Sequence, residues 1–166
     1  MSDAKRGRGI VDPWRKVEPL RAPPRTPAVE RERIDLDDID RDADLAVPGR
    51  YIIRSEHACF DVTSTRVETP ADALEVLADC VCTLFMNKAI GTTLIDAGIG
   101  IRFRDRAWNV PSEETPASQL TGGKAVIWFV EMPLDQGMLV LAKILRTIAV
   151  STTLRRYGIV VMLTAS

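Results

Sequence analysis

The feature that most constrains how this chain folds is a change of sequence character near Pro48. Residues 1–47 are charged, are interrupted by prolines and contain few large apolar side chains. Ordering a residue costs about 1–2 kcal/mol, so a segment with so little apolar surface to bury is predicted to be a disordered N-terminal arm. Residues 48–166 show apolar periodicity over a length that suits one hydrophobic core, so we expect a single domain there.

The charges of the predicted arm fall into two blocks. The first block is basic through Lys5, Arg6, Arg8, Arg15, Lys16, Arg21 and Arg25. The second is acidic through Asp35, Asp37, Asp38, Asp40, Asp42 and Asp44. Ile34, Leu36, Ile39 and Leu45 lie among these carboxylates. Such a composition either folds against a partner groove or stays solvated, and we expect the solvated state.

Composition limits the classes of function. The chain is 46% hydrophobic and 27% charged with a formal net charge of −1, so overall charge gives no argument for a polyanionic partner. The N-terminus has no apolar core of a signal peptide, and charged residues interrupt the longest apolar stretches. We therefore expect a soluble, cytoplasmic protein with no membrane partner, in which Cys59, Cys80 and Cys82 are reduced, packed thiols.

Periodicity and capping signals predict the elements of residues 48–166. Residues 51–62 lack a helical period and predict one interrupted strand or a tight hairpin. Thr69, Pro70 and Asp72 form a typical helix start, and apolar residues continue the helix to about Asn87. The remaining predicted elements are strands at 101–108, 124–132 and 159–163, a long loop at 109–123 and a second helix at 133–156.

The order strand, helix, strand, strand, helix, strand is that of a ferredoxin-like split βαβ fold (βαββαβ). In this α+β architecture two helices cover one face of a four-stranded antiparallel sheet. The last strand, 159–163, has apolar side chains on both faces, so the open face of the sheet needs a cover. The second helix also carries apolar residues on the side that Lys143 and Arg146 mark as solvent-facing.

These surplus apolar positions make a non-catalytic protein-interaction or assembly module the leading hypothesis. The domain would dock a protein partner or a second copy of itself, most simply as a homodimer, through its sheet and second helix. The candidate interface residues are Leu139, Val150, Leu154, Val160, Met162 and Trp128.

The second hypothesis is a nucleic-acid-binding module. Arg102, Arg104 and Arg106 alternate along the strand predicted at 101–108, and Trp108 follows them. Arginines and aromatics on an exposed sheet can hold phosphates and stack bases. Residues 124–132 lack the aromatic and glycine signature of such modules, and an arginine row is more often a solvated face or a protein interface.

Signals for an enzyme or a metal site are weak. His57, Cys59, Cys80 and Cys82 match a zinc ligand set in number, but positions two apart on a helix point about 200° from each other. The same residues offer a Cys and His nucleophilic pair that nothing else supports. We assign no catalytic residue, metal or cofactor, and a small enzyme with a site near loop 109–123 is the third hypothesis.

Two further motifs fail on inspection. The run 40–44 begins like a calcium-binding EF-hand loop, but Leu45 stands where the turn glycine belongs. Gly98, Gly100, Gly122 and Gly123 fit no complete phosphate-loop fingerprint and are predicted to be turn glycines.

Overall fold

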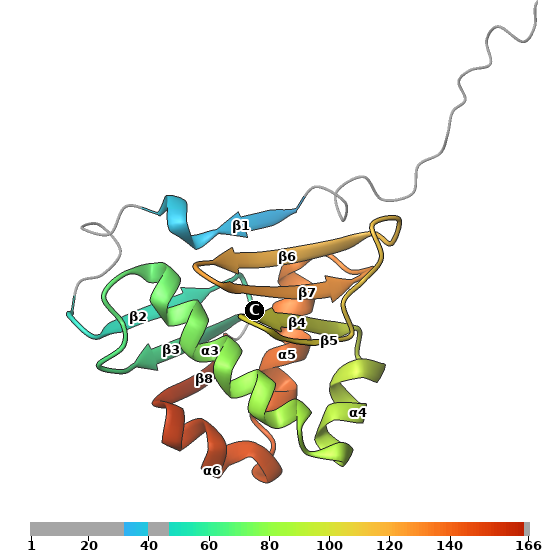
Figure 1. Cartoon of the computed structure of the whole chain (residues 1–166). Helices are drawn as coiled ribbons and strands as arrows, with labels where there is room; N and C mark the ends of the chain where they lie inside the picture. Colours follow the sequence, from blue (N-terminus) through green and yellow to red (C-terminus); the bar gives the residue numbers. More distant parts are fainter. Residues whose placement is uncertain (1–31, 40–46, 165–166) are drawn as a thin grey trace, which may run out of the picture.

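The computed structural model describes residues 32–39 and 47–164, which form an α+β structure (Figure 1). The strands are β1 (Arg33–Asp35), β2 (Arg50–Arg54), β3 (Ala58–Thr63), β4 (Ile99–Phe103), β5 (Arg106–Trp108), β6 (Ala117–Gly122), β7 (Ala125–Val130) and β8 (Ile159–Leu163). The helices are the 3-10 helix η3 (Leu36–Asp38) and the α-helices α3 (Pro70–Phe85), α4 (Lys88–Asp96), α5 (Leu134–Leu145) and α6 (Ile148–Tyr157).

The strands of the described residues form two sheets, whereas the sequence predicted one four-stranded antiparallel sheet. The larger sheet has five strands in the order β1, β6, β7, β4, β5, with β1 parallel to β6 and the other neighbours antiparallel. The smaller sheet is antiparallel, in the order β2, β3, β8. The α+β class is therefore confirmed, but the strand number and the sheet arrangement differ from the ferredoxin-like prediction.

Part of the predicted disordered arm is ordered. Residues 33–38 form β1 and η3, and Leu36 is buried in the core. The side chain of Asp35 caps η3 by accepting a hydrogen bond from the amide of Asp37. Ile34 and Leu36 thus fold against the chain's own core instead of staying solvated. The other residues of the predicted arm, 1–31 and 40–46, lie outside the described residues, and so does the whole EF-hand-like run 40–44.

Helix α3 lies between the two sheets and contacts strands of both (Figure 1). Its predicted start is confirmed: Thr69 Oγ1 accepts from the amide of Asp72 at 3.2 Å, and the Asp72 carboxylate accepts from the amide of Thr69 at 2.9 Å. Pro70 occupies the first turn, where its missing N–H costs nothing. Most α3 side chains are buried, as the narrow polar stripe of its sequence indicated.

The second helix, predicted as one element over 133–156, is two helices. Helices α5 and α6 are separated at Arg146 and Thr147 and differ in direction by 100°. No proline or glycine lies at this break, so no local signal predicts it. Helix α6 ends as predicted, at Gly158 with φ of +72°.

Within the described residues no single helix is long and apolar enough to cross a membrane. Helices α5 and α6 together reach the length and composition of a bent span, and several of their apolar residues are buried in the core.

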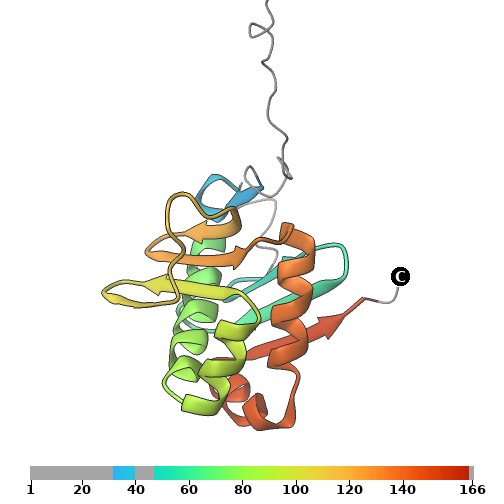
Figure 2. The ribbon, with the colours of Figure 1, turned by 90° about the vertical axis from the view of Figure 1, so that its right-hand side faces the viewer.

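Two adjacent stretches also differ from their predictions. The strand expected at 101–108 is the hairpin β4–β5, which turns at Arg104 with a φ of +59°. The loop expected at 109–123 contains β6, so its irregular part is shorter. Figure 2 shows this hairpin projecting on the opposite side of the molecule from α5.

Candidate functional site

Strand β8 lies at the edge of the three-stranded sheet and carries exposed apolar side chains. In the part of the chain that the structure describes, β8 pairs only with β3. Ile159 and Val161 are buried, whereas Val160 is 57% and Met162 41% exposed. The prediction that this strand is apolar on both faces is thus confirmed, and its outer face is uncovered by the described residues.

Some backbone N–H and C=O groups of β8 point outward at this open edge of the sheet. The carbonyl of Gly158 and the amide of Thr164 bond to β3. Since bonding alternates along an antiparallel pair, the N–H and C=O groups of Ile159, Val161 and Leu163 point away from β3. The edge therefore offers backbone donors and acceptors that have no partner strand among the described residues, beside apolar side chains.

The strand next to β8 adds little net charge to this surface. Asp61 on β3 is opposite Val160, and both oxygens of its carboxylate accept from Arg50, at 2.9 Å from Nε and 2.6 Å from Nη2. The hydrogen bonds that Arg50 donates to Asp61 raise the pKa of Arg50. The charges of Asp61 and Arg50 neutralise each other, so the exposed surface along β8 is mainly the apolar side chains of Val160 and Met162.

A groove runs beside β8 on the side of α6. Its volume is about 460 Å³. Leu145, Leu154 and Ile159 form apolar parts of its lining, and Arg146 and Arg155 also line the groove. Ile148, in the first turn of α6, is 92% exposed. We call Val160, Met162, Leu163 and this groove the β8 surface.

The structure brings only some of the predicted interface residues together. Val160 and Met162 are exposed on one face of β8, and the buried Leu154 lines the groove together with Val160. Val150 is 1% exposed and belongs to the core. The prediction was wrong because it placed Val150 at 100° per residue along one continuous helix over 133–156, whereas the helix breaks before α6. Leu139 is half-buried in α5, and Trp128 lies on the other sheet.

The arginine row does not form a single surface. The turn at Arg104 reverses the chain, so Arg102 and Arg106 end on opposite faces of the sheet. Arg106 Nη2 lies 2.9 Å from Asp79 Oδ1 on α3, a hydrogen bond that raises the pKa of Arg106. Trp108 stacks on Phe85 of α3 with ring centroids 5.5 Å apart. The three arginines therefore do not form the single exposed face on which the nucleic-acid hypothesis depended.

The cysteines of α3 are packed in the core. Burial raises the pKa of Cys80 to about 12 and that of Cys82 to about 11, so both thiols stay protonated at neutral pH. Cys59 is half-buried on β3, and His57 lies in the turn before it. Among the described residues no three His, Cys, Asp or Glu side chains gather as a metal site.

Gly98 and Gly123 have positive φ and lie in turns, as predicted. The prediction was wrong for Gly100 and Gly122, which lie in strands β4 and β6. The amide of Gly123 donates to the Asp37 carboxylate, and the amide of Lys124 donates to Glu75 at 2.7 Å. These two backbone amides, which a phosphate loop would need as donors to phosphate, already donate to carboxylates.

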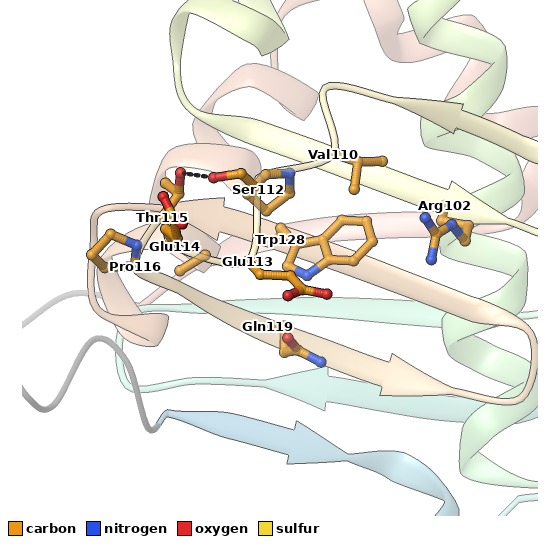
Figure 3. A pocket seen from close by; sticks show the side chains of 11 residues that line it. Arg102, Val110, Ser112, Glu113, Glu114, Thr115, Pro116, Gln119 and Trp128 are labelled. Atoms are coloured by element: carbon orange, nitrogen blue, oxygen red, sulfur yellow. Dashed lines mark hydrogen bonds between the residues drawn. The ribbon is translucent and has the colours of Figure 1, made fainter.

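A second concave surface lies on the outer face of the five-stranded sheet (Figure 3). The connection between β5 and β6 borders it, and the strands β4, β6 and β7 contribute its other residues. The volume is about 740 Å³. We call it the outer-face groove; its lining consists of Arg102, Val110, Pro111, Ser112, Glu113, Glu114, Thr115, Pro116, Ala117, Gln119 and Trp128. The sequence pointed to loop 109–123 without showing that Trp128 and Arg102 face it.

Comparison with family models, with curated proteins and with solved structures found no match.

Proposed function

We propose that the chain is a non-catalytic assembly module that forms a homodimer through the β8 surface. One observation carries this proposal: Val160 and Met162 are exposed on an edge strand whose backbone also lacks a neighbour among the described residues. Edge strands of this kind are usually shortened, charged or covered, because they invite pairing with another chain. β8 itself carries no charged residue.

A second copy fits this edge because antiparallel pairing is self-complementary about a twofold axis. With the axis at Val161, the outward-pointing groups of Val161 bond to those of Val161 in the second copy. Ile159 bonds to Leu163 of the second copy in the same way. This register uses every β8 residue whose backbone points away from β3.

The same register pairs the exposed side chains. Val160 lies opposite Met162 of the second copy at a position without backbone hydrogen bonds, where side chains approach closest. The two three-stranded sheets then continue as one six-stranded sheet, and the groove beside β8 adds apolar area to the contact. No charge is placed against a like charge within the pairing strands.

The native mass of the full chain, measured by sedimentation over a concentration series, tests this proposal. We expect a concentration-dependent rise from 18.4 kDa to twice that value. Val160→Lys should shift the midpoint of assembly at least tenfold upward, because it places an ammonium group among apolar side chains.

Val47→Lys is the matched control. Val47 is 50% exposed, similar to Val160, but it precedes β2 on the opposite side of the sheet. It should leave the assembly midpoint within about twofold of the wild type. Equal effects of the two substitutions would argue that assembly does not use β8.

A further inference from the structure

The outer-face groove has an aromatic and apolar lining beside an acidic loop. Trp128 of β7 is half-buried in it, and the connection between β5 and β6 adds Val110, Pro111 and Pro116 to the apolar lining (Figure 3). Arg102 lies with its guanidinium carbon 5.5 Å from the centre of the Trp128 ring. The groove therefore combines an aromatic side chain with proline and valine walls.

The groove is held in shape at both ends of this connection. Asn109 Nδ2 donates to the carbonyl of Ile99 at 3.0 Å, and the amide of Glu131 donates to the carbonyl of Pro116 at 2.8 Å. Between them, Ser112 and Thr115 share a hydroxyl hydrogen bond of 2.7 Å. A ligand would thus meet a largely preformed site, which lowers the entropic cost of binding.

The connection also gives the groove a negative rim. Glu113 and Glu114 are exposed, and neither carboxylate is within salt-bridge distance of a basic side chain of the described residues. Two adjacent carboxylates beside an aromatic ring favour a ligand that carries arginine or lysine.

The chain holds such a segment at 21–27, with the sequence Arg-Ala-Pro-Pro-Arg-Thr-Pro. In a polyproline II helix, residues three apart share an edge, and Arg21, Pro24 and Pro27 have this spacing. Proline-rich segments of this kind dock aromatic-lined grooves because their stiff backbone loses little entropy. Arg25 adds a second positive charge.

The attachment of this segment places it near the groove. The carbonyl of Glu32 accepts from the amide of Gln119, and Glu32 also accepts from the amide of Leu134 through its side chain. Gln119 is the register partner of Arg33 and lines the groove. Pro27 precedes Glu32 by five residues, which span at most about 18 Å.

The direction of the chain agrees with this placement. Strand β1 runs parallel to β6, so the chain enters β1 at the end where the connection carrying Glu113 and Glu114 enters β6. A tether this short gives an effective concentration on the order of millimolar, which makes even a weak contact well populated.

We propose that residues 21–27 are the segment that binds in the outer-face groove of their own chain. Pro24 and Pro27 pack against Trp128, and Arg21 and Arg25 face the carboxylates of Glu113 and Glu114. This proposal is independent of the β8 dimer, because the two surfaces lie on different sheets.

The test compares the full chain with its Pro24→Ala/Pro27→Ala variant by the NMR resonance of the Trp128 indole N–H, assigned with Trp128→Phe. The variant should shift this resonance, and the Pro13→Ala/Pro19→Ala control should not. A synthetic peptide of residues 18–30 should bind the Pro24→Ala/Pro27→Ala variant at least tenfold more tightly than the wild type, in which the groove is already filled.

A second variant probes the groove without touching the core. Glu113→Lys/Glu114→Lys should reproduce the shift and weaken peptide binding, because both residues are exposed. An unchanged Trp128 resonance in the Pro24→Ala/Pro27→Ala variant would overturn the proposal. Loss of the wild-type resonance position on dilution would also overturn it, since it would assign the segment in the groove to a second copy.

Discussion

Arg106 of the β4–β5 hairpin and Asp79 of α3 are joined side chain to side chain, with 2.9 Å between Nη2 and Oδ1. The other oxygen of Asp79 accepts from Arg66 at 3.2 Å, so one carboxylate ties α3 to two separate segments. This contact explains why Arg106 is turned toward the helix and away from Arg102.

Asp79→Ala should lower the free energy of unfolding by about 1 kcal/mol, because it leaves the half-buried Arg106 and the exposed Arg66 without their shared partner. Chemical denaturation followed by circular dichroism measures the change. Asp96→Ala removes an exposed carboxylate at the end of α4 and should change stability by less than about 0.5 kcal/mol. Equal effects would contradict a structural role for Asp79.

Gly137→Ala should destabilise the protein by about 1–3 kcal/mol, although alanine is the better helix former. A Cβ at Gly137 of α5 would overlap the ring of Phe129 on β7. Gln136→Ala, at the exposed neighbouring position, should be close to neutral. A Gly137→Ala variant as stable as the wild type would show that α5 is not packed this closely on β7.

The buried thiols predict how stability depends on alkaline pH. Burial raises the pKa of Cys80 to about 12 and that of Cys82 to about 11, from an ordinary value of 9.0. Above about pH 9 the unfolded chain loses these protons while the native chain keeps them, so stability falls as pH rises toward 11, by up to about 1.4 kcal/mol per unit and thiol.

The pH effect can be isolated by comparing denaturation of the wild type and of Cys80→Ala/Cys82→Ala between pH 8 and pH 11. The double variant starts from a lower stability, because it opens space in the core, but its slope above pH 9 should be flatter. Identical slopes would mean that the two thiols are not shielded from solvent in the folded chain.

Local signals in the sequence predicted local structure well. The cap at Thr69 and the end of α6 near Gly158 were predicted from short motifs and are confirmed. For residues 51–62 the sequence left one interrupted strand or a tight hairpin open, and the structure has the hairpin. The turn at Arg104 was missed because it adopts a positive φ without glycine or asparagine.

The partition into two sheets could not be predicted in the same way. Strand β1 has three residues and pairs with β6, more than eighty positions away, so its pattern is too short to be recognised. The break between α5 and α6 lacks proline and glycine and was not predicted. As a result Val150, which is buried in the core, was predicted to lie on the surface. Val160 and Met162 were identified because a five-residue apolar strand is conspicuous by itself.

The β8 register predicts a charge-pair rescue. Val160→Glu and Met162→Lys should each weaken the dimer, because each buries an unpaired charge. When both substitutions are in one chain, the dimer contains two pairs of a carboxylate opposite an ammonium group, one at each end of the register. The double variant should therefore dimerise about tenfold more strongly than either single variant. Sedimentation of the three variants measures this. Additive weakening would contradict the register.

The most direct test of the β8 dimer is the hydrogen exchange of the Ile159, Val161 and Leu163 amides, measured over a concentration series. These three N–H groups point away from β3 and bond to the second copy in the proposed register. Their exchange should slow by about tenfold or more as the concentration passes the dimer midpoint, while the amides of Val160 and Met162, already bonded to β3, change less. Exchange of Val161 that is fast and independent of concentration would contradict the account.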